Sequence, residues 1–387
     1  MATLLLDSLF KGLGIGSVLL IAALGLAIIF GLMGVINLAH GELMMLGAYA
    51  TFVVQNIFKP LGEPWYSFYI IVAIPVAFIV SAIFGLILER GAIRFLYGRP
   101  LETLLATWGV SLILQQFVRS VSWLLFISIG IFVLFFFGGL KLLKSKIDWA
   151  KYKNIAIAVL LILSSAIATV FYNLLQANSK LTKAWFSARN VDVTAPKWLR
   201  GGIDLLDIRM PYSRLFIISL TIICLIGVYL FLERSTWGLK IRAVTQNRTM
   251  SSCLGIPTEK VDTLTFALGS GLAGIAGCAV SLLGSVGPNT GQNYIVDTFM
   301  VVVVGGVGNL LGTILAALGI GTLNYLIGSG TIGTLLGDLS APQFLLDFFD
   351  FFATTSMAKV MVFALIITFL QIKPAGLFPP KGRTAEL

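Results

Sequence analysis

Charged side chains are scarce in this sequence. Asp, Glu, Lys and Arg together make up 11% of its 387 residues, whereas 58% are hydrophobic and the mean hydropathy is +0.96. Soluble domains carry roughly 25% charged residues, so the composition excludes an ordinary soluble protein and indicates a polytopic membrane protein. The net charge of +10 is typical of cytoplasmic loops rich in Lys and Arg, and we do not expect nucleic-acid binding.

Catalytic and metal-binding side chains are also few. The only histidine is His40, and Cys224, Cys253 and Cys278 lack the spacing of metal ligands. The sequence shows no nucleophile beside a base and no paired carboxylates, so we expect neither an enzyme nor a bound metal or other cofactor. The phosphate-binding loop Gly-x-x-x-x-Gly-Lys-[Ser/Thr] is missing as well. Any ATP that drives this chain is therefore expected to be bound by another subunit.

Long apolar windows fill most of the chain. A spanning helix needs about 20 apolar residues, and the windows predict an all-α polytopic membrane bundle of about 9–11 transmembrane helices in a single domain, 1–387. They lie at residues 12–31, 35–58, 68–88, 104–121, 123–140, 154–176, 214–232, 261–284, 294–307, 309–328 and 353–371. The window at 294–307 is short and interrupted by glycine, which is typical of a half-helix.

The segments between the windows differ in charge. Those rich in Lys and Arg are expected on the cytoplasmic face: residues 89–99, 141–153, 233–260 and the tail after Ile372. Segment 329–350 carries three aspartates and no Lys or Arg, which suits the outer face. Segment 177–213 is a misfit, because it holds six basic residues but must lie outside. Long segments follow the charge rule poorly.

Residues 233–258 form the most polar stretch inside this apolar chain. They cannot lie in lipid, because a charge at the bilayer centre costs at least about 2.5–3.5 kcal/mol. From Leu239 to Arg248, apolar and basic residues alternate as in a short amphipathic helix, which we expect to end at Gly255. We interpret the stretch as a helix presented to a partner in the cytoplasm.

Several motifs occur in a recognisable order along the chain. They are NLAHGELMMLGAYATF (37–52), RAVTQNRTMSSCLGIP (242–257), FALGSGLAGIAG (266–277), VVVVGGVGNLLGT (301–313) and KPAGLFPPKGR (373–383). These motifs resemble the permease subunits of branched-chain amino-acid-type ABC importers. Four more are similar to the urea-uptake permeases of that family: TWGVSLILQQFVRS (107–120), NVDVTAPKWLRGG (190–202), MPYSRLFI (210–217) and VGPNTGQNYIVDTFM (286–300).

The resemblance covers most of the chain and departs from the family pattern at residues 121–187. Two apolar windows and a lysine-rich loop are inserted there, and we expect an inserted transmembrane hairpin. Within the third motif, Gly269 to Gly274 matches Gly-x-Gly-x-x-Gly, a pattern known from dinucleotide-binding loops. Because it lies in an apolar window, we interpret it as a surface for close helix packing.

The resemblance implies a multi-pass permease that translocates urea across the bacterial cytoplasmic (inner) membrane by alternating access. The implied partners are a second homologous permease subunit, two ATP-binding-cassette subunits, a periplasmic substrate-binding protein and the surrounding lipid. The alternatives are a branched-chain amino acid or short-chain amide permease of the same family, and a passive urea or amide channel that needs no ATPase. By resemblance, ATPase coupling falls on the stretch 233–258, with these contact residues: Trp237, Leu239, Arg242, Val244, Gln246, Asn247 and Gly255.

Glycine and polar residues are expected to interrupt two apolar segments, 31–47 and 284–312. Paired interruptions in the two halves of a transporter point to a substrate site near the membrane midplane, because unwound backbone at that depth is buried in protein or lines a cavity. The candidates for the substrate path are Asn37, His40, Glu42, Thr107, Ser111, Gln115, Asn289, Gln292 and Asp297. Those in the first segment have an alternative role, which is to hydrogen-bond to one another and fix a helix break.

The candidates for the path carry mainly amide and hydroxyl groups. Thr107, Ser111 and Gln115 follow one another at helical spacing on one face. Urea is small and neutral, so such groups suit it. A zwitterionic amino acid needs a positive and a negative group that face each other, and the sequence offers few charged candidates.

Overall fold

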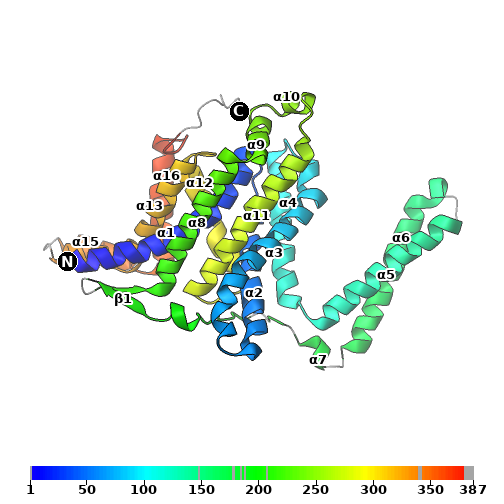
Figure 1. The fold of residues 1–387 in the computed structure, drawn as a ribbon, viewed down its shortest axis with the longest axis horizontal. Helices are drawn as coiled ribbons and strands as arrows, with labels where there is room; N and C mark the ends of the chain where they lie inside the picture. The colour runs from blue at the N-terminus through cyan, green and yellow to red at the C-terminus, as the bar shows by residue number, and fades with distance from the viewer. Residues whose placement is uncertain are drawn as a thin grey trace. The chain divides into compact units, whose positions relative to one another are not determined.

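The structure of this chain is a computed structural model that describes residues 2–146, 149–176, 179–183, 185–186, 189–205, 208–338 and 342–378. In these residues, nine helices are long and apolar enough to cross a membrane (Figure 1), which confirms the expected all-α polytopic bundle. They are α1 (Ala2–Met33), α3 (Tyr69–Gly91), α4 (Pro100–Ser120), α5 (Trp123–Lys146), α6 (Trp149–Leu175), α8 (Tyr212–Arg234), α11 (Thr258–Leu283), α13 (Leu310–Gly328) and α16 (Thr355–Ile372).

The remaining elements are shorter or less apolar. The helices are α2 (His40–Phe58), α7 (Ser179–Thr182), α9 (Thr236–Gln246), α10 (Arg248–Cys253), α12 (Thr290–Gly305), α14 (Thr331–Asp338) and α15 (Gln343–Phe352). Four 3-10 turns are η1 (Lys59–Leu61), η2 (Trp65–Phe68), η3 (Ile93–Leu96) and η4 (Lys197–Leu199). Strands β1 (Gly202–Leu205) and β2 (Ile208–Pro211) pair antiparallel, with Ile203 opposite Met210.

The chain divides into two compact units, where the sequence predicts one domain. One unit holds the residues up to Leu112 and from Val191 onward, and the other holds Ile113–Asn190. The boundary falls inside α4. The second unit thus includes the stretch 121–187, where we expect an insertion. In the second unit α5 packs against α6, and only 6% and 11% of their apolar windows are buried.

Helix α11 is the centre of the first unit and packs against α1, α2 and α3. Of its apolar window 78% is buried, as in α1. A Cβ atom added at Gly269, Gly274 or Gly277 would overlap the backbone of α1, α3 or α2, respectively. In lipid the hydrophobic effect does not drive helices together. Association depends instead on close packing, which small residues permit. The structure thus confirms that the glycine pattern at Gly269–Gly274 serves helix packing.

Contacts at the two ends of α11 show which connecting segments lie at the same end of the first unit. At one end a backbone bridge joins Val191 to Val286, which follows α11. At the other end the Thr263 hydroxyl of α11 donates to Glu89 of α3 over 2.9 Å. The segment before α8 therefore lies at the opposite end of the first unit from the segments after α3 and before α11.

This arrangement gives a physical reason for the misfit in the charge pattern at residues 177–213. Lys197 pairs with Glu63 at 3.5 Å, and the Trp198 indole nitrogen donates to the Ser67 carbonyl over 2.7 Å. This part of the basic segment thus rests on the loop between α2 and α3, which supplies an acidic partner. This pairing offsets the charge of Lys197, one of the six basic residues of the segment.

We expect Gly277→Ala to destabilise the protein, because the new methyl group would overlap the Met44 carbonyl of α2. Overpacking of this kind costs typically about 1–3 kcal/mol. Denaturation of the detergent-solubilised protein by SDS should show a lower midpoint. The matched control is Gly319→Ala on α13, where an added Cβ meets no atom within 4 Å. Ala is the better helix former by roughly 0.5–1 kcal/mol, so this control should be unchanged or more stable. Equal losses in both variants would contradict the packing argument.

Candidate functional site

Two interruptions of helical structure define the candidate site, and both were predicted from glycine and polar residues. Residues 34–39 separate α1 from α2, and residues 284–289 separate α11 from α12. Gly34 has a φ of +67°, which L side chains rarely adopt, so the chain can turn there. Asn37 in the first interruption and Val286 in the second are buried. The expected breaks are therefore present, and each is covered by protein in part, whereas Gly34, Gly284, Ser285 and Asn289 are exposed.

The two helices that follow these breaks meet at their first turns. Gly41 is the second residue of α2, and Gly291 is the second residue of α12. A Cβ atom added at either glycine would overlap the backbone of the other. Each helix N-terminus carries a partial positive charge of roughly half a proton charge. The contact therefore brings two positive helix ends together inside the protein.

The Glu42 carboxylate lies at this meeting point. It belongs to the first turn of α2 and is only 1% exposed. Its Oε1 accepts a hydrogen bond from the Ser111 hydroxyl of α4 at 3.1 Å. A Cβ atom added at Gly291 would lie 2.7 Å from its Oε2. A buried carboxylate needs positive or hydrogen-bonding neighbours, and the two helix ends and Ser111 supply them.

The other buried candidates near Glu42 hold the first break in place. The Asn37 side-chain oxygen accepts from the Ala39 amide over 3.1 Å, and Thr107 Oγ1 accepts from the Leu38 amide over 3.1 Å. His40 Nε2 lies 3.0 Å from the Ala22 carbonyl of α1 and must donate to it, because a carbonyl oxygen only accepts. These bonds tie the break to α1 and α4, whereas the alternative drawn from the sequence had the polar side chains of this segment bonded to one another.

The remaining candidates for the substrate path are divided among the start of α12, the middle of α12 and the second half of α4. Asn289 and Gln292 are exposed at the start of α12, and Gln115 lies on the part of α4 that belongs to the second unit. Asp297 is buried on α12 and pairs with Lys359 of α16 at 2.8 Å. Sequence reasoning did not single out Lys359, although a lone lysine in an apolar window signals a buried acidic partner.

The polar stretch between α8 and α11 forms two helices, where the sequence predicts one. Asn247 ends α9 and caps α10, because its side-chain oxygen accepts from the Met250 amide over 2.9 Å. The inner face of α9 buries Ile241 and Val244 against Val261 of α11. Gly255 follows α10 with a φ of +79°, as suits a residue that ends a helix.

The outer face of these two helices carries exposed apolar side chains. Leu239, Met250 and Leu254 are 63%, 60% and 75% exposed, although they lie outside the candidate spans. We call these three residues the docking surface.

The residues expected to couple to an ATPase are divided between the two faces. Leu239 lies on the outer face, and Gln246 and Asn247 are also exposed. Trp237 and Val244 pack inward on α9, and Arg242 pairs with Glu233 at the end of α8.

Comparison with known proteins gives one family over nearly the whole chain. The family described as "Branched-chain amino acid transport system / permease component" matches residues 8–370. The branched-chain amino acid permease BraD of Pseudomonas aeruginosa is 26% identical over 318 residues, which cover 82% of this chain and 84% of BraD. LivH of Salmonella typhimurium, a permease of the same kind, is 22% identical over 374 residues, 96% of this chain and 94% of LivH.

A sugar permease is also similar over part of the chain. The ribose import permease RbsC of Escherichia coli is 26% identical over 183 residues, which cover 44% of this chain and 50% of RbsC. No solved structure matches the chain.

We expect Glu42→Ala to destabilise the protein, because Ser111 loses its acceptor and the two helix ends lose their counter-charge. An unsatisfied buried group costs about 1–3 kcal/mol, which should lower the SDS midpoint clearly. Glu42→Gln keeps an oxygen for Ser111 and should lose less. Glu102→Ala, which removes an exposed carboxylate, should leave the midpoint unchanged. If the Gln and Ala variants at position 42 match the wild type, the carboxylate does not hold the helix ends together.

Proposed function

Because the chain belongs to the family of permease components of branched-chain amino acid transport systems, we propose that it is the membrane-spanning subunit of an importer driven by separate ATP-binding-cassette subunits. The observation that carries this proposal is the docking surface. Three apolar side chains are exposed on a basic segment that lies between two candidate spans and cannot enter lipid.

The construction of the segment suits a rigid attachment point. Val244 and Ile241 anchor α9 on α11, so the outer face is held in a fixed orientation. Apolar side chains that are exposed outside the candidate spans are available for contact with a partner protein. An ATP-binding subunit that covers the docking surface would bury these side chains and would contact α9, which packs directly on α11 of the bundle.

By family membership, we expect four partner proteins of three kinds for this subunit. They are a second homologous permease, two ATP-binding-cassette subunits and a periplasmic binding protein that delivers the substrate. A multi-pass location in the bacterial cytoplasmic membrane agrees with the nine apolar helices in the described residues. The relatives are transport permeases, which fits the expectation that this chain is not an enzyme.

Substrate passage requires the contact between Gly41 and Gly291 to open. In the present structure the two glycines close the space between the ends of α2 and α12. A substrate that binds both conformations equally cannot shift their equilibrium, so we assign the driving force to ATP binding and hydrolysis in the partner. We call this contact the gate.

The electrostatics of the gate favour a branched-chain amino acid as the substrate. Once the gate opens, two positive helix ends are free for the carboxylate of the substrate, as in transporters whose broken helices bind anionic groups. Glu42 is beside them and suits the ammonium group. A zwitterion thus finds both of the groups it needs, and the names of the branched-chain amino acid permeases BraD and LivH agree with this substrate class.

Urea is the second candidate. Ser111 and the backbone near the first break offer neutral hydrogen-bonding groups, and four motifs of the sequence are similar to urea-uptake permeases. Urea has no charge to match the helix ends, however, so it would gain less from the gate than an amino acid.

We predict that Leu239→Glu combined with Leu254→Glu abolishes attachment of the ATP-binding subunits. A charge placed in a buried contact costs several kcal/mol, and a loss of only 1.4 kcal/mol already weakens binding about tenfold. Copurification of the ATP-binding subunits from detergent extracts measures this directly. Leu61→Glu, the same change at an exposed leucine in η1, is the control and should retain them. Normal copurification with the double variant would remove the docking surface from the proposal.

We predict that vesicles containing the complete transporter accumulate labelled leucine only when ATP and the binding protein are supplied. Unlabelled isoleucine should compete, and urea should not. Vesicles that hold this chain alone should accumulate neither solute. Uptake of urea with no uptake of leucine would favour the second candidate, and uphill transport by the chain alone would contradict an ATP-driven mechanism.

A further inference from the structure

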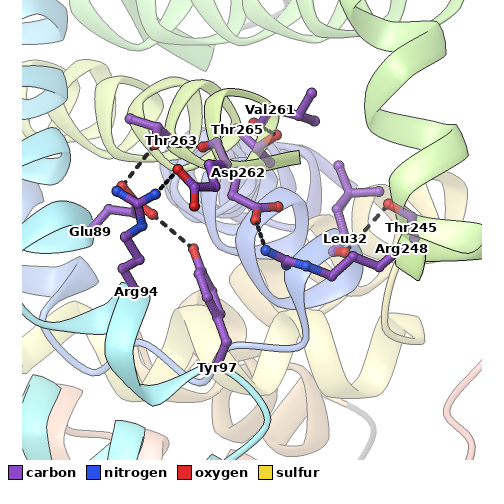
Figure 2. Close-up of polar contacts among 11 residues, drawn as sticks. Leu32, Glu89, Arg94, Tyr97, Thr245, Arg248, Val261, Asp262, Thr263 and Thr265 are labelled. Carbon is purple, nitrogen blue, oxygen red and sulfur yellow. Dashed lines mark hydrogen bonds and ion pairs between the residues drawn. The ribbon is translucent and has the colours of Figure 1, made fainter. Parts of the chain in front are cut away.

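A cluster of polar side chains joins α10 to α3 and α11, and Figure 2 shows Arg248, Asp262, Tyr97, Glu89 and Thr263 in it. Arg248, the first residue of α10, lies 2.6 Å from Asp262 of α11, and its guanidinium carbon lies 5.2 Å from the centre of the Tyr97 ring. The Tyr97 hydroxyl donates to Glu89 Oε1 over 3.2 Å. The Thr263 hydroxyl of α11 donates to Glu89 Oε2 over 2.9 Å.

The carboxylates of this cluster occupy unfavourable places. The Asp262 side chain is 5% exposed, and Glu89 is buried as well. Glu89 also lies in the last turn of α3, where the negative end of the helix disfavours a carboxylate. Burial and the Glu89 carboxylate both raise the pKa of Tyr97 above its ordinary value, so its phenol stays protonated and donates. The cluster therefore joins three elements at a cost in local electrostatics.

The cluster is connected to the gate through α3. Ser81 lies eight residues before Glu89 on this helix, a distance of about 12 Å along its axis. The Ser81 hydroxyl donates to the Leu43 carbonyl of α2 over 2.8 Å, and Leu43 directly follows Glu42. Helix α11 also contacts Ser81, because a Cβ atom added at Gly274 would lie 2.5 Å from Ser81 Oγ. A displacement of this end of α3 and α11 therefore reaches the residues at the gate.

We propose that the Arg248–Asp262 ion pair, with Tyr97 and Glu89, transmits movement of α9 and α10 to α3 and α11 and so opens the gate. This inference rests on the proposed function. It assigns Arg248, Asp262, Tyr97 and Glu89 as positioning residues that act on the substrate only through α3 and α11. None of them belongs to the residues expected to contact an ATPase.

Helix α9 makes other contacts as well: Ile241 and Val244 pack against Val261 of α11, and two polar contacts join α9 to α8 and α1. The ion pair of Arg242 with Glu233 joins α9 to the end of α8, the helix just before it in the chain. The Thr245 hydroxyl is 3.4 Å from the Leu32 carbonyl of α1 and only 2.9 Å from the Ile241 carbonyl of its own helix. The Arg248 pair is the contact that joins α10 to α11, the most central helix of the unit.

The test is a charge exchange in the complete transporter, with three measurements on each variant. They are copurification of the ATP-binding subunits, ATP hydrolysis, and the number of substrate molecules moved per ATP hydrolysed. The single variants Arg248→Gln and Asp262→Asn should retain the ATP-binding subunits and hydrolyse ATP but move at least about tenfold less substrate per ATP. The exchange Arg248→Asp with Asp262→Arg restores the pair and should return the ratio to within about threefold of the wild type.

An exposed ion pair at the same end provides the matched control. Arg99 and Glu102 lie 3.1 Å apart and are both more than half exposed. Arg99→Gln, and the exchange Arg99→Asp with Glu102→Arg, should leave the ratio unchanged. Should Asp262→Asn fail to fold, Arg248→Gln still tests the pair, because the Arg248 side chain is 48% exposed.

Each outcome decides the inference. An unchanged ratio in the single variants, a parallel loss of hydrolysis and transport, or no rescue by the exchange overturns transmission through this pair. Loss of the ATP-binding subunits in the single variants also overturns it, because the pair would then serve docking. A wild-type complex that transports without ATP would instead contradict the proposed function, and the two failures remain distinguishable.

Discussion

Close approach of helix backbones at glycine is the constraint on which the rest of this structure depends. Lipid provides no hydrophobic force between helices, so contact must come from packing and polar groups. Helix α11 meets its three neighbours through glycines, and the ends of α2 and α12 meet through Gly41 and Gly291. The same kind of contact thus serves two purposes. Along α11 it holds the bundle together, and at the gate it closes the space between two helix ends that must separate for the substrate to pass.

Buried carboxylates are the second feature that organises the molecule. The described residues include four, and each is compensated by a different element. Glu42 has the helix ends and Ser111, Asp297 has Lys359 of α16, Asp262 has Arg248 of α10, and Glu89 has two hydroxyl donors. Because a buried charge that loses its partner is costly, these contacts make the relative positions of the helices interdependent. A movement that separates one of these pairs raises the free energy of the protein, so a new favourable contact elsewhere must offset it.

The partial charges of helix ends bear on the choice of substrate. The sequence offers few charged side chains for a zwitterion, which favoured a neutral solute such as urea. The two helix N-termini at Gly41 and Gly291 are positive without any basic side chain. They supply the missing partner for a carboxylate, and the amino acid then becomes the better match.

The sequence by itself determined the membrane class, most of the spanning helices, the two interruptions and the family, because composition, apolar length and motifs are properties of local segments. It also located the polar stretch 233–258, although it predicted one helix there and did not resolve the break at Asn247. Which polar side chains meet was decided only by the tertiary structure. Glu42 and Ser111 come together and Asn289 stays exposed, while Arg248 reaches Asp262, because these contacts depend on how helices distant in sequence cross. Local patterns specify which helices form, and the packing at glycines decides which of their polar groups face one another.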